Sequence, residues 1–257
     1  MIETALGRRV GRRTTIFGIG CAAMAMAFPS SADAHGSTTP PNHSASASRS
    51  AQSPIDFHEK EITFVSHLPK IGFSYPQTDV TLVNTGSPDE FATVRADVPP
   101  GAACIILNAV RHDLVQFHWH TPSEHRIEGR QTPLEMHFVH RQASGSLLVI
   151  GVFIERGRTN SAIDPIFRKL PDQPGATRDV AGVHLGELLP AGRESFRYWG
   201  SLTVPPFTEG VQFVVFTDSI HLAARQISAF RELFGKRNSR EVQSLNGRKI
   251  LSNAHAG

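Results

Sequence analysis

Cysteine is scarce in this chain of 257 residues, which contains only Cys21 and Cys104. Cys21 lies in an N-terminal segment that we expect to be removed, so the mature chain would keep a single cysteine. One cysteine cannot form an intrachain disulfide, and the fold must be stable without one. With 40% hydrophobic and 19% charged residues, the chain has enough apolar side chains to build a substantial core instead.

Long hydrophobic runs are also missing, and no segment reaches the ~20 consecutive apolar residues of a membrane-spanning helix. The nearest approach, Ile16 to Phe28, follows arginines at positions 8, 9, 12 and 13 and precedes Ala32-Asp33-Ala34. Positive charge, a short apolar run and an A-x-A site are typical of a signal peptide, here residues 1–34. We therefore expect a periplasmic or secreted protein with no membrane attachment after cleavage. The paired arginines also suit twin-arginine export, and the sequence leaves that pathway and the general one open.

No block of lysines and arginines interleaved with aromatic residues is present. The formal net charge is +3, from 26 Lys+Arg and 23 Asp+Glu. Residues 1–34 hold four of the basic and two of the acidic residues, so the remainder has 22 against 21, a net charge of +1. A nearly neutral chain gives no support for nucleic-acid binding. The composition does not indicate an oligomeric state.

Residues 35–51, HGSTTPPNHSASASRSA, contain almost nothing that could be buried and are expected to form a flexible polar leader. We expect one domain over residues 52–257. Short runs of β character follow from Gln52 onward, separated by Gly, Pro and Asn. These runs are Glu61–Val65, Asp79–Val83, Ile105–Leu107, Val115–His120, Glu135–Arg141, Leu147–Ile154 and Val211–Phe216. Apolar residues at helical spacing predict helices at Asn160–Leu170 and His221–Phe234. The fold class is therefore mainly β (α+β).

Histidines gather in two of these predicted strands, within QFHWH at 116–120 and EMHFVHR at 135–141. Alternate side chains of a strand share a face, so His118 and His120 point to the same side. In the second strand His137 shares a face with Glu135. Two neighbouring strands could thus present three imidazoles to one point, which is the number of protein ligands at a catalytic zinc.

A chain with 13 histidines can place two of them near each other by chance. The flanking residues favour a metal site, because a ligand imidazole needs an acceptor for its second nitrogen. Gln116 lies two residues before His118, and Glu135 lies two residues before His137. Five other histidines lack such neighbours in the sequence and are expected to be structural or exposed: His112, His125, His140, His184 and His221.

Six motifs extend this pattern along the chain: QSPID at 52–56, QFHWHTPSEH at 116–125, LEMHFVH at 134–140, LLVIGVF at 147–153, YWGSLTVPPFTEGV at 198–211 and NSREVQSLNGRKIL at 238–251. From Gln52 to about Leu251 the chain thereby resembles the α-class carbonic anhydrases, in particular exported bacterial members. The resemblance implies a single domain built on a large twisted, mostly antiparallel sheet with a few peripheral helices. It also implies zinc-dependent, reversible hydration of carbon dioxide to bicarbonate and a proton by a zinc-bound hydroxide.

The resemblance assigns roles to individual residues. The zinc ligands are His118, His120 and His137, and their hydrogen-bond acceptors are Gln116, Glu135 and the backbone of Asn238. Thr203 and Glu124 are the catalytic pair, in which Thr203 accepts a hydrogen bond from the hydroxide and donates one to Glu124. The substrate-binding residues, which include an apolar wall for carbon dioxide, are Val139, Val149, Leu202, Thr203, Val204 and Phe213.

The chain departs from the family at several positions. Ser87 stands where many members have a proton-relay histidine, and a serine does not titrate near neutrality. Val204 replaces a frequent second threonine. Phe207 stands where bacterial members often have a cysteine, consistent with the missing disulfide, and the aromatic segment that usually precedes QSPID is absent.

Two other functions remain open on the sequence alone. Domains that resemble this family also serve as non-catalytic binding modules, although such modules typically lose ligand histidines and this chain keeps all three. Ester hydrolysis is expected only as a side activity of the same nucleophile.

The signal peptide leads to the first prediction: the exported protein should begin at or near His35, directly after Ala32-Asp33-Ala34. N-terminal sequencing of protein recovered from the exported fraction checks this. Recovery of Met1 at the N-terminus would contradict both the signal peptide and the expected compartment.

Overall fold

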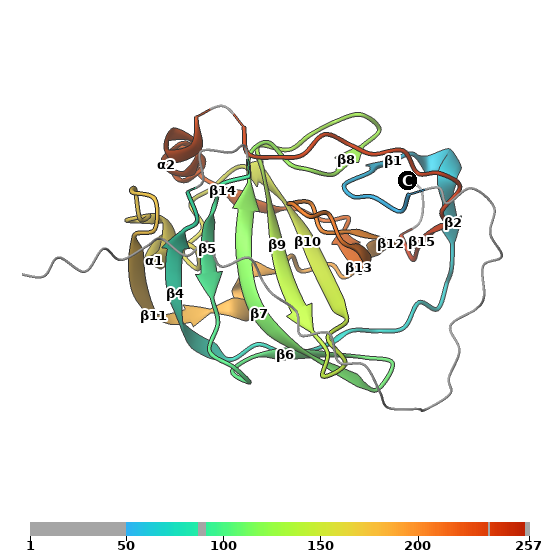
Figure 1. Cartoon of the computed structure of the whole chain (residues 1–257), viewed down its shortest axis with the longest axis horizontal. Coiled ribbons are helices and arrows are strands. Elements are labelled where there is room, and N and C mark those ends of the chain that lie inside the picture. Colours follow the sequence, from blue (N-terminus) through green and yellow to red (C-terminus); the bar gives the residue numbers. More distant parts are fainter. Residues whose placement is uncertain (1–49, 87–90, 236, 255–257) are drawn as a thin grey trace, which may run out of the picture. The chain divides into compact units, whose positions relative to one another are not determined.

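Alternating apolar and polar residues produce one large sheet in the computed structural model (Figure 1). The structure describes residues 50–86, 91–235 and 237–254, within one compact unit that spans residues 47–257. The strands are β1 Asp56–Phe57, β2 Ile62–Phe64, β3 Gly72–Ser74, β4 Gln77–Asn84, β5 Val94–Asp97, β6 Cys104–Leu107, β7 Val110–His120, β8 Arg126–Ile127, β9 Leu134–Arg141, β10 Leu147–Arg156, β11 Thr177–His184, β12 Ser195–Ser201, β13 Glu209–Phe216, β14 Ile220–Leu222 and β15 Ile250–Ser252. Among these described residues no helix has the length and hydropathy needed to span a membrane.

The main sheet has 13 strands, with the order β11-β4-β5-β7-β9-β10-β13-β12-β15-β2 along its principal path. Strand β14 joins it beside β10, and β6 pairs with β3 and β7. Most neighbours are antiparallel, and the parallel pairs in this sheet are β10 with β13, β10 with β14 and β15 with β2. The predicted fold class, mainly β with a large and mostly antiparallel sheet, is confirmed.

The helices are shorter than the sequence predicted. Helix α1 spans only Asp164–Phe167, because Pro165 fits only the first turn of a helix and the residue before Pro171 is disfavoured in helical geometry. Helix α2 spans Ala224–Phe234 instead of beginning at His221, since residues 220–222 pair with β10 as β14. It ends at Gly235, whose φ of 68° suits glycine. Short 3₁₀ helices lie at Glu59–Glu61 and Leu185–Leu188.

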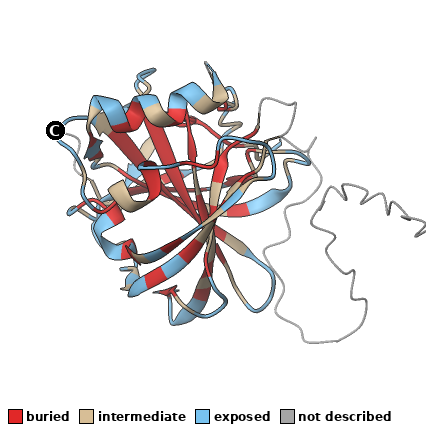
Figure 2. Cartoon of the chain, turned by 90° about the vertical axis from the view of Figure 1, so that its left-hand side faces the viewer, coloured by how far each residue is buried: buried red, intermediate tan, exposed pale blue. Residues whose placement is uncertain are grey.

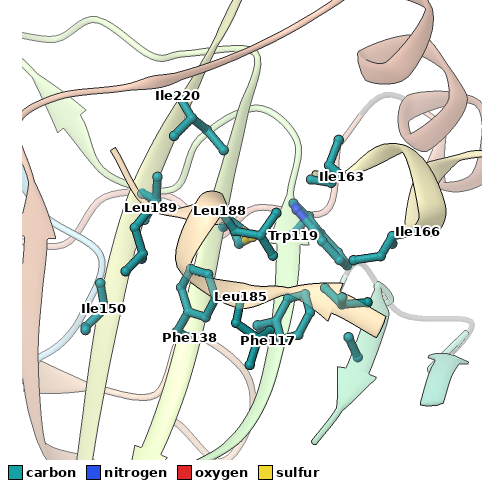
Figure 3. Packing of buried hydrophobic residues seen from close by; sticks show 14 of the residues in the cluster. Phe117, Trp119, Phe138, Ile150, Ile163, Ile166, Leu185, Leu188, Leu189 and Ile220 are labelled. Atoms are coloured by element: carbon teal, nitrogen blue, oxygen red, sulfur yellow. The ribbon is translucent and has the colours of Figure 1, made fainter. Parts of the chain in front are cut away.

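The two faces of the sheet have different partners, because successive side chains of a strand point to opposite faces. Leu148, Ile150 and Val152 of β10 belong to the larger apolar cluster, which includes Trp119, whereas Val149 belongs to a second cluster. Figure 2 shows the buried residues concentrated in the strands. Figure 3 shows Trp119 packed among residues from several elements of the larger cluster. One face of the sheet therefore supplies the main core, and the other is available for a site.

Helix α2 is held to the larger cluster by Phe230, which is fully buried. Its ring centroid lies 6.3 Å from that of Trp119 and 6.2 Å from that of Phe167. Phe230→Ala should lower the free energy of unfolding by about 3–5 kcal/mol, because it leaves a cavity that packed neighbours cannot fill. Denaturant unfolding measures this. Trp199→Ala is the control, since Trp199 is 58% exposed and should change stability by less than about 1 kcal/mol; equal losses would contradict the assigned packing.

Candidate metal centre

Three histidines meet where β7 and β9 pair. The strands are antiparallel, with His118 opposite His137 and His120 opposite Glu135. Directly opposed residues point to the same face of a sheet, so the two strands bring their polar residues together. One ring nitrogen from each of His118, His120 and His137 lies within 4.8 Å of the others. The pairing of the two strands thus brings the three histidines into a cluster that could hold one metal ion.

The second ring nitrogen of each histidine has an acceptor. His118 Nδ1 lies 2.8 Å from Gln116 Oε1, and His137 Nε2 lies 2.8 Å from Glu135 Oε1. His120 Nδ1 lies 3.1 Å from the backbone carbonyl oxygen of Asn238. These contacts leave Nε2 of His118, Nε2 of His120 and Nδ1 of His137 for a metal.

One of these remaining nitrogens is an orphaned buried atom. Nε2 of His120 is enclosed and has no hydrogen-bond partner, although buried polar atoms normally have one. A metal ion bound by all three imidazoles would satisfy it. Three nitrogen donors, each with an acceptor behind its ring, are a donor set that would suit zinc.

Burial sets the protonation of the cluster. It lowers the pKa of His118 well below its usual value, helped by the neighbouring charges of His120, His137 and Arg95. Burial also lowers the pKa of His120. For His137, burial acts in the same direction, but the charge and hydrogen bond of Glu135 outweigh it and the net pKa is raised. His118 and His120 are therefore neutral near pH 7, as metal ligation requires.

Glu135 is a fully buried carboxylate that orders more than one histidine. It accepts hydrogen bonds from His137 Nε2, from the backbone N–H of His125 at 2.8 Å and from His125 Nδ1 at 2.7 Å. Burial alone would raise its pKa, but His125 and His137 hold that pKa well below the usual value. Glu135 therefore remains charged and fixes the ring of His137.

His125 is a member of this network that sequence reasoning did not identify. Its Nε2 lies 2.7 Å from the hydroxyl of Tyr198, which lies 2.8 Å from Ser53 Oγ. The sequence places no acceptor two residues from His125, but the chain turns between β7 and β9 and returns His125 to Glu135, so it is a buried structural histidine. The group His125, Glu135 and His137 could also hold a metal by proximity alone. However, its polar atoms already bond to one another, so the first cluster is the better candidate.

A glycine makes room for the buried carboxylate. Gly151 of β10 lies opposite His137 of β9. A Cβ atom at Gly151 would lie 3.0 Å from Glu135 Oε1 and 3.2 Å from Val215. Larger residues are therefore disfavoured behind Glu135.

Glu124 lies beside the histidines, and its side chain is buried. Its Oε1 accepts a hydrogen bond of 2.9 Å from the backbone N–H of Arg240. Its Oε2 has no hydrogen-bond partner and lies 3.5 Å from His120 Nε2 and 3.8 Å from His137 Nδ1. Thr203 is buried on the loop after β12, but the hydrogen bonds of the described residues include none between Thr203 and Glu124. The link between these two side chains stays a prediction.

The apolar residues assigned to substrate binding form a patch beside His137. Val149 of β10 lies opposite Val139 of β9 on one side and Phe213 of β13 on the other. All three belong to the second apolar cluster, against which Leu202 packs. Val204 is half-buried in the following loop. The ring of Phe213 lies 6.0 Å from that of His137 between centroids, so the patch adjoins the candidate ligands.

A cavity of about 500 Å³ lies elsewhere, and Phe57, Ile62 and Phe196 are among its lining residues. It contains none of the three clustered histidines and does not define the site. Ser87, the position assigned to a proton relay, lies outside the described residues.

Three imidazoles that face one point, each with its own acceptor, lie on a large and mostly antiparallel sheet and form a site that could hold a metal ion. A family model described as eukaryotic-type carbonic anhydrase matches residues 35–254. The chain therefore belongs to the eukaryotic-type, or α, carbonic anhydrase family, which is a family of enzymes. The resemblance seen in the sequence is confirmed.

Relatives cover most of the chain. A carbonic anhydrase of Neisseria gonorrhoeae is 34% identical over 200 residues, 78% of this chain and 76% of that protein. One of Klebsiella pneumoniae is 34% identical over 203 residues, 78% of this chain and 79% of that protein. The solved structure of an α-carbonic anhydrase from Thermovibrio ammonificans with the inhibitor sulfanilamide matches with a TM-score of 0.73 and 34% identity, covering 78% of this chain and 86% of that one.

The geometry predicts one zinc per chain and loss of that zinc in His137→Ala, because two imidazoles cannot complete the site. Metal analysis of dialysed protein checks the stoichiometry. His184→Ala is the matched control, since His184 is exposed and outside the cluster. Full zinc occupancy in His137→Ala would remove His137 from the ligand set.

Proposed function

We propose that this protein catalyses the zinc-dependent, reversible hydration of carbon dioxide to bicarbonate and a proton. The observation that carries the proposal is the cluster of three histidines. Each uses one ring nitrogen to contact its acceptor, and the other ring nitrogens lie close together beside an apolar patch. Membership of the carbonic anhydrase family supports the reaction.

Zinc, when bound, would supply the nucleophile by lowering the pKa of a water molecule to about 7, a value that belongs to the carbonic anhydrase family. The chain's own residues hold the ligands in place. Gln116, Glu135 and the Asn238 carbonyl each accept a hydrogen bond from one imidazole ring and so fix the orientation of the three rings.

Carbon dioxide is small and has no net charge, so an apolar surface can hold it without strong hydrogen bonds. That surface is formed by one residue from each of three neighbouring strands: Val139 of β9, Val149 of β10 and Phe213 of β13. Leu202 packs against the same cluster and extends it toward the loop that carries Thr203. The substrate would thereby be held next to the ligand histidines, which increases the rate by proximity.

We assign the orientation of the attacking oxygen to Thr203 and Glu124. The unpartnered Oε2 of Glu124 is available to accept a hydrogen bond from the Thr203 hydroxyl. A hydroxyl that donates to a carboxylate must accept from any other donor, and this would fix the direction of the nucleophile's lone pair. No general base is needed for the attack itself.

The protein is proposed to act outside the cytoplasm, on the strength of the arginines, apolar run and cleavage motif of residues 1–34. Stopped-flow measurement of carbon dioxide hydration with matched metal analysis tests the proposed reaction, because zinc-loaded protein without turnover would contradict it.

Thr203→Ala should lower kcat/KM for hydration by roughly 10²-fold, the scale of losing one well-positioned polar group, while zinc stays bound. Stopped-flow rates per bound zinc measure this. Thr208→Ala is the control, since Thr208 is exposed on the same loop. An undiminished rate in Thr203→Ala would assign the orienting role to another group.

Proton release generates a further prediction, because Ser87 cannot relay a proton by titration near neutrality. Each hydration releases one proton. The rate of direct proton transfer to water from a group with a pKa near 7 is limited to on the order of 10³ to 10⁴ per second. We expect kcat to increase with the concentration of imidazole buffer while kcat/KM, which reports the steps before proton release, stays constant. Ser87→His should weaken the buffer dependence. A high kcat that is already independent of buffer at low concentration would indicate a relay elsewhere in the chain.

A further inference from the structure

Phe207 has a backbone conformation that its side chain disfavours. It lies on the loop between β12 and β13 and has a φ of 59°, in the left-handed region that bulky residues rarely adopt. Such conformations persist where surrounding contacts hold them, and they gather at functional sites. The contacts around Phe207 therefore indicate what the strained loop is for.

Backbone bonds close this loop around Thr203. The N–H of Phe207 donates to the Val204 carbonyl at 2.9 Å, and the N–H of Leu202 donates to the Thr208 carbonyl at 2.9 Å. The carbonyl of Phe207 also accepts a bond of 3.1 Å from Gln52 Nε2. Thr203 lies inside the closed segment, so the position of Phe207 constrains the position of Thr203.

Arg240 holds the ring of Phe207. Its guanidinium carbon lies 3.8 Å from the ring centroid, within the range of a cation–π contact. Nη1 of Arg240 donates to Gln52 Oε1 at 2.8 Å and to the Ser53 carbonyl at 2.7 Å, which fixes the plane of the guanidinium. The ring of Phe91 meets Phe207 edge to face at 5.7 Å between centroids.

Arg240 also contacts Glu124, the second member of the catalytic pair. The backbone N–H of Arg240 donates to Glu124 Oε1 at 2.9 Å. One residue thus contacts Glu124 through its backbone and the Thr203 loop through its side chain. A shift of Arg240 relative to Phe207 would change the separation of Thr203 and Glu124.

We propose that Phe207 and Arg240 are positioning residues, a clamp that sets Thr203 at the distance from Glu124 at which the threonine orients the nucleophile. This inference rests on the proposed function. The clamp acts through the loop and does not touch the substrate. Among the described residues the one cysteine, Cys104, is free, and a stacked cation and aromatic ring provides the constraint between the QSPID segment and the loop.

The experiment compares Phe207→Ala, which removes the ring, with Phe207→Tyr, which keeps a ring of the same shape. Arg240→Lys removes the same stacking contact from the other side, because it keeps the backbone N–H and the positive charge but not the planar guanidinium. Trp199→Ala controls for the loss of an exposed aromatic side chain. Each variant is assayed as the zinc-loaded full chain for hydration kcat/KM per bound zinc, and for hydrogen exchange at the amides of Leu202 and Phe207.

Phe207→Ala and Arg240→Lys should each lower kcat/KM by about 10-fold with zinc content unchanged, on the scale of a misplaced catalytic group. Both substitutions should increase the rate of amide exchange at residues 202 and 207. Phe207→Tyr should keep kcat/KM and the exchange rates at wild-type values. In a Thr203→Ala background the Phe207→Ala change should lower kcat/KM by less than about 2-fold, because the clamp acts through the threonine. If Phe207 had a purely structural role, Phe207→Ala would lower stability but would not show this dependence on Thr203.

Different results would overturn the clamp and the proposed function. Unchanged amide exchange in both variants would mean that the stack does not hold the loop. A loosened loop with wild-type kcat/KM, or full additivity with Thr203→Ala, would mean that it does not position the threonine. Zinc-loaded wild-type protein without hydration activity would refute the proposed function, while amide exchange would still test the clamp.

Discussion

The pairing of β7 with β9 is the constraint on which both the core and the site depend. In this register His118 lies opposite His137, while Phe117 lies opposite Phe138 on the other face. A slip of one residue would exchange the two faces, placing imidazoles in the core and aromatic rings at the site. The burial of Phe117 and Phe138 therefore stabilises the same register that assembles the histidines. Hydrophobic packing on one face determines the geometry of the polar groups on the other.

The buried charge of Glu135 is an electrostatic cost of this arrangement. An unpaired carboxylate in the interior would be strongly unfavourable, but three donors from His125 and His137 compensate it. Gly151 leaves space behind the carboxylate. The result is a rigid support for one candidate ligand, extended through Tyr198 to Ser53 near the start of the described chain. Order at the metal centre is thus linked to the QSPID segment and, through Arg240 and Gln52, to the loop of Thr203.

Seven strands were predictable because their residues have β propensity and lie between turn residues. The missed elements have other causes. Strand β12 contains Arg197, whose charge argues against a buried strand, yet its guanidinium donates to the Pro69 carbonyl and to Ser195. Strand β14 has only three residues and was assigned to the start of a helix, because local spacing does not reveal pairing with β10. Helix α1 has the apolar spacing of a longer helix, but Pro165 in its first turn and Pro171 beyond its end shorten it.

The sequence by itself determined the features that depend on neighbours two residues apart. Strand alternation puts Gln116 beside His118 and Glu135 beside His137, and both acceptor contacts are present. Only the tertiary structure decided the contacts between distant segments. The acceptor for His120 is a carbonyl 118 residues away, which resemblance to a family suggested but spacing could not. The contact of His125 with Glu135 and the stacking of Arg240 on Phe207 depend on the paths of loops. Loop paths follow from packing and long-range hydrogen bonds, which leave no periodic signal in the sequence.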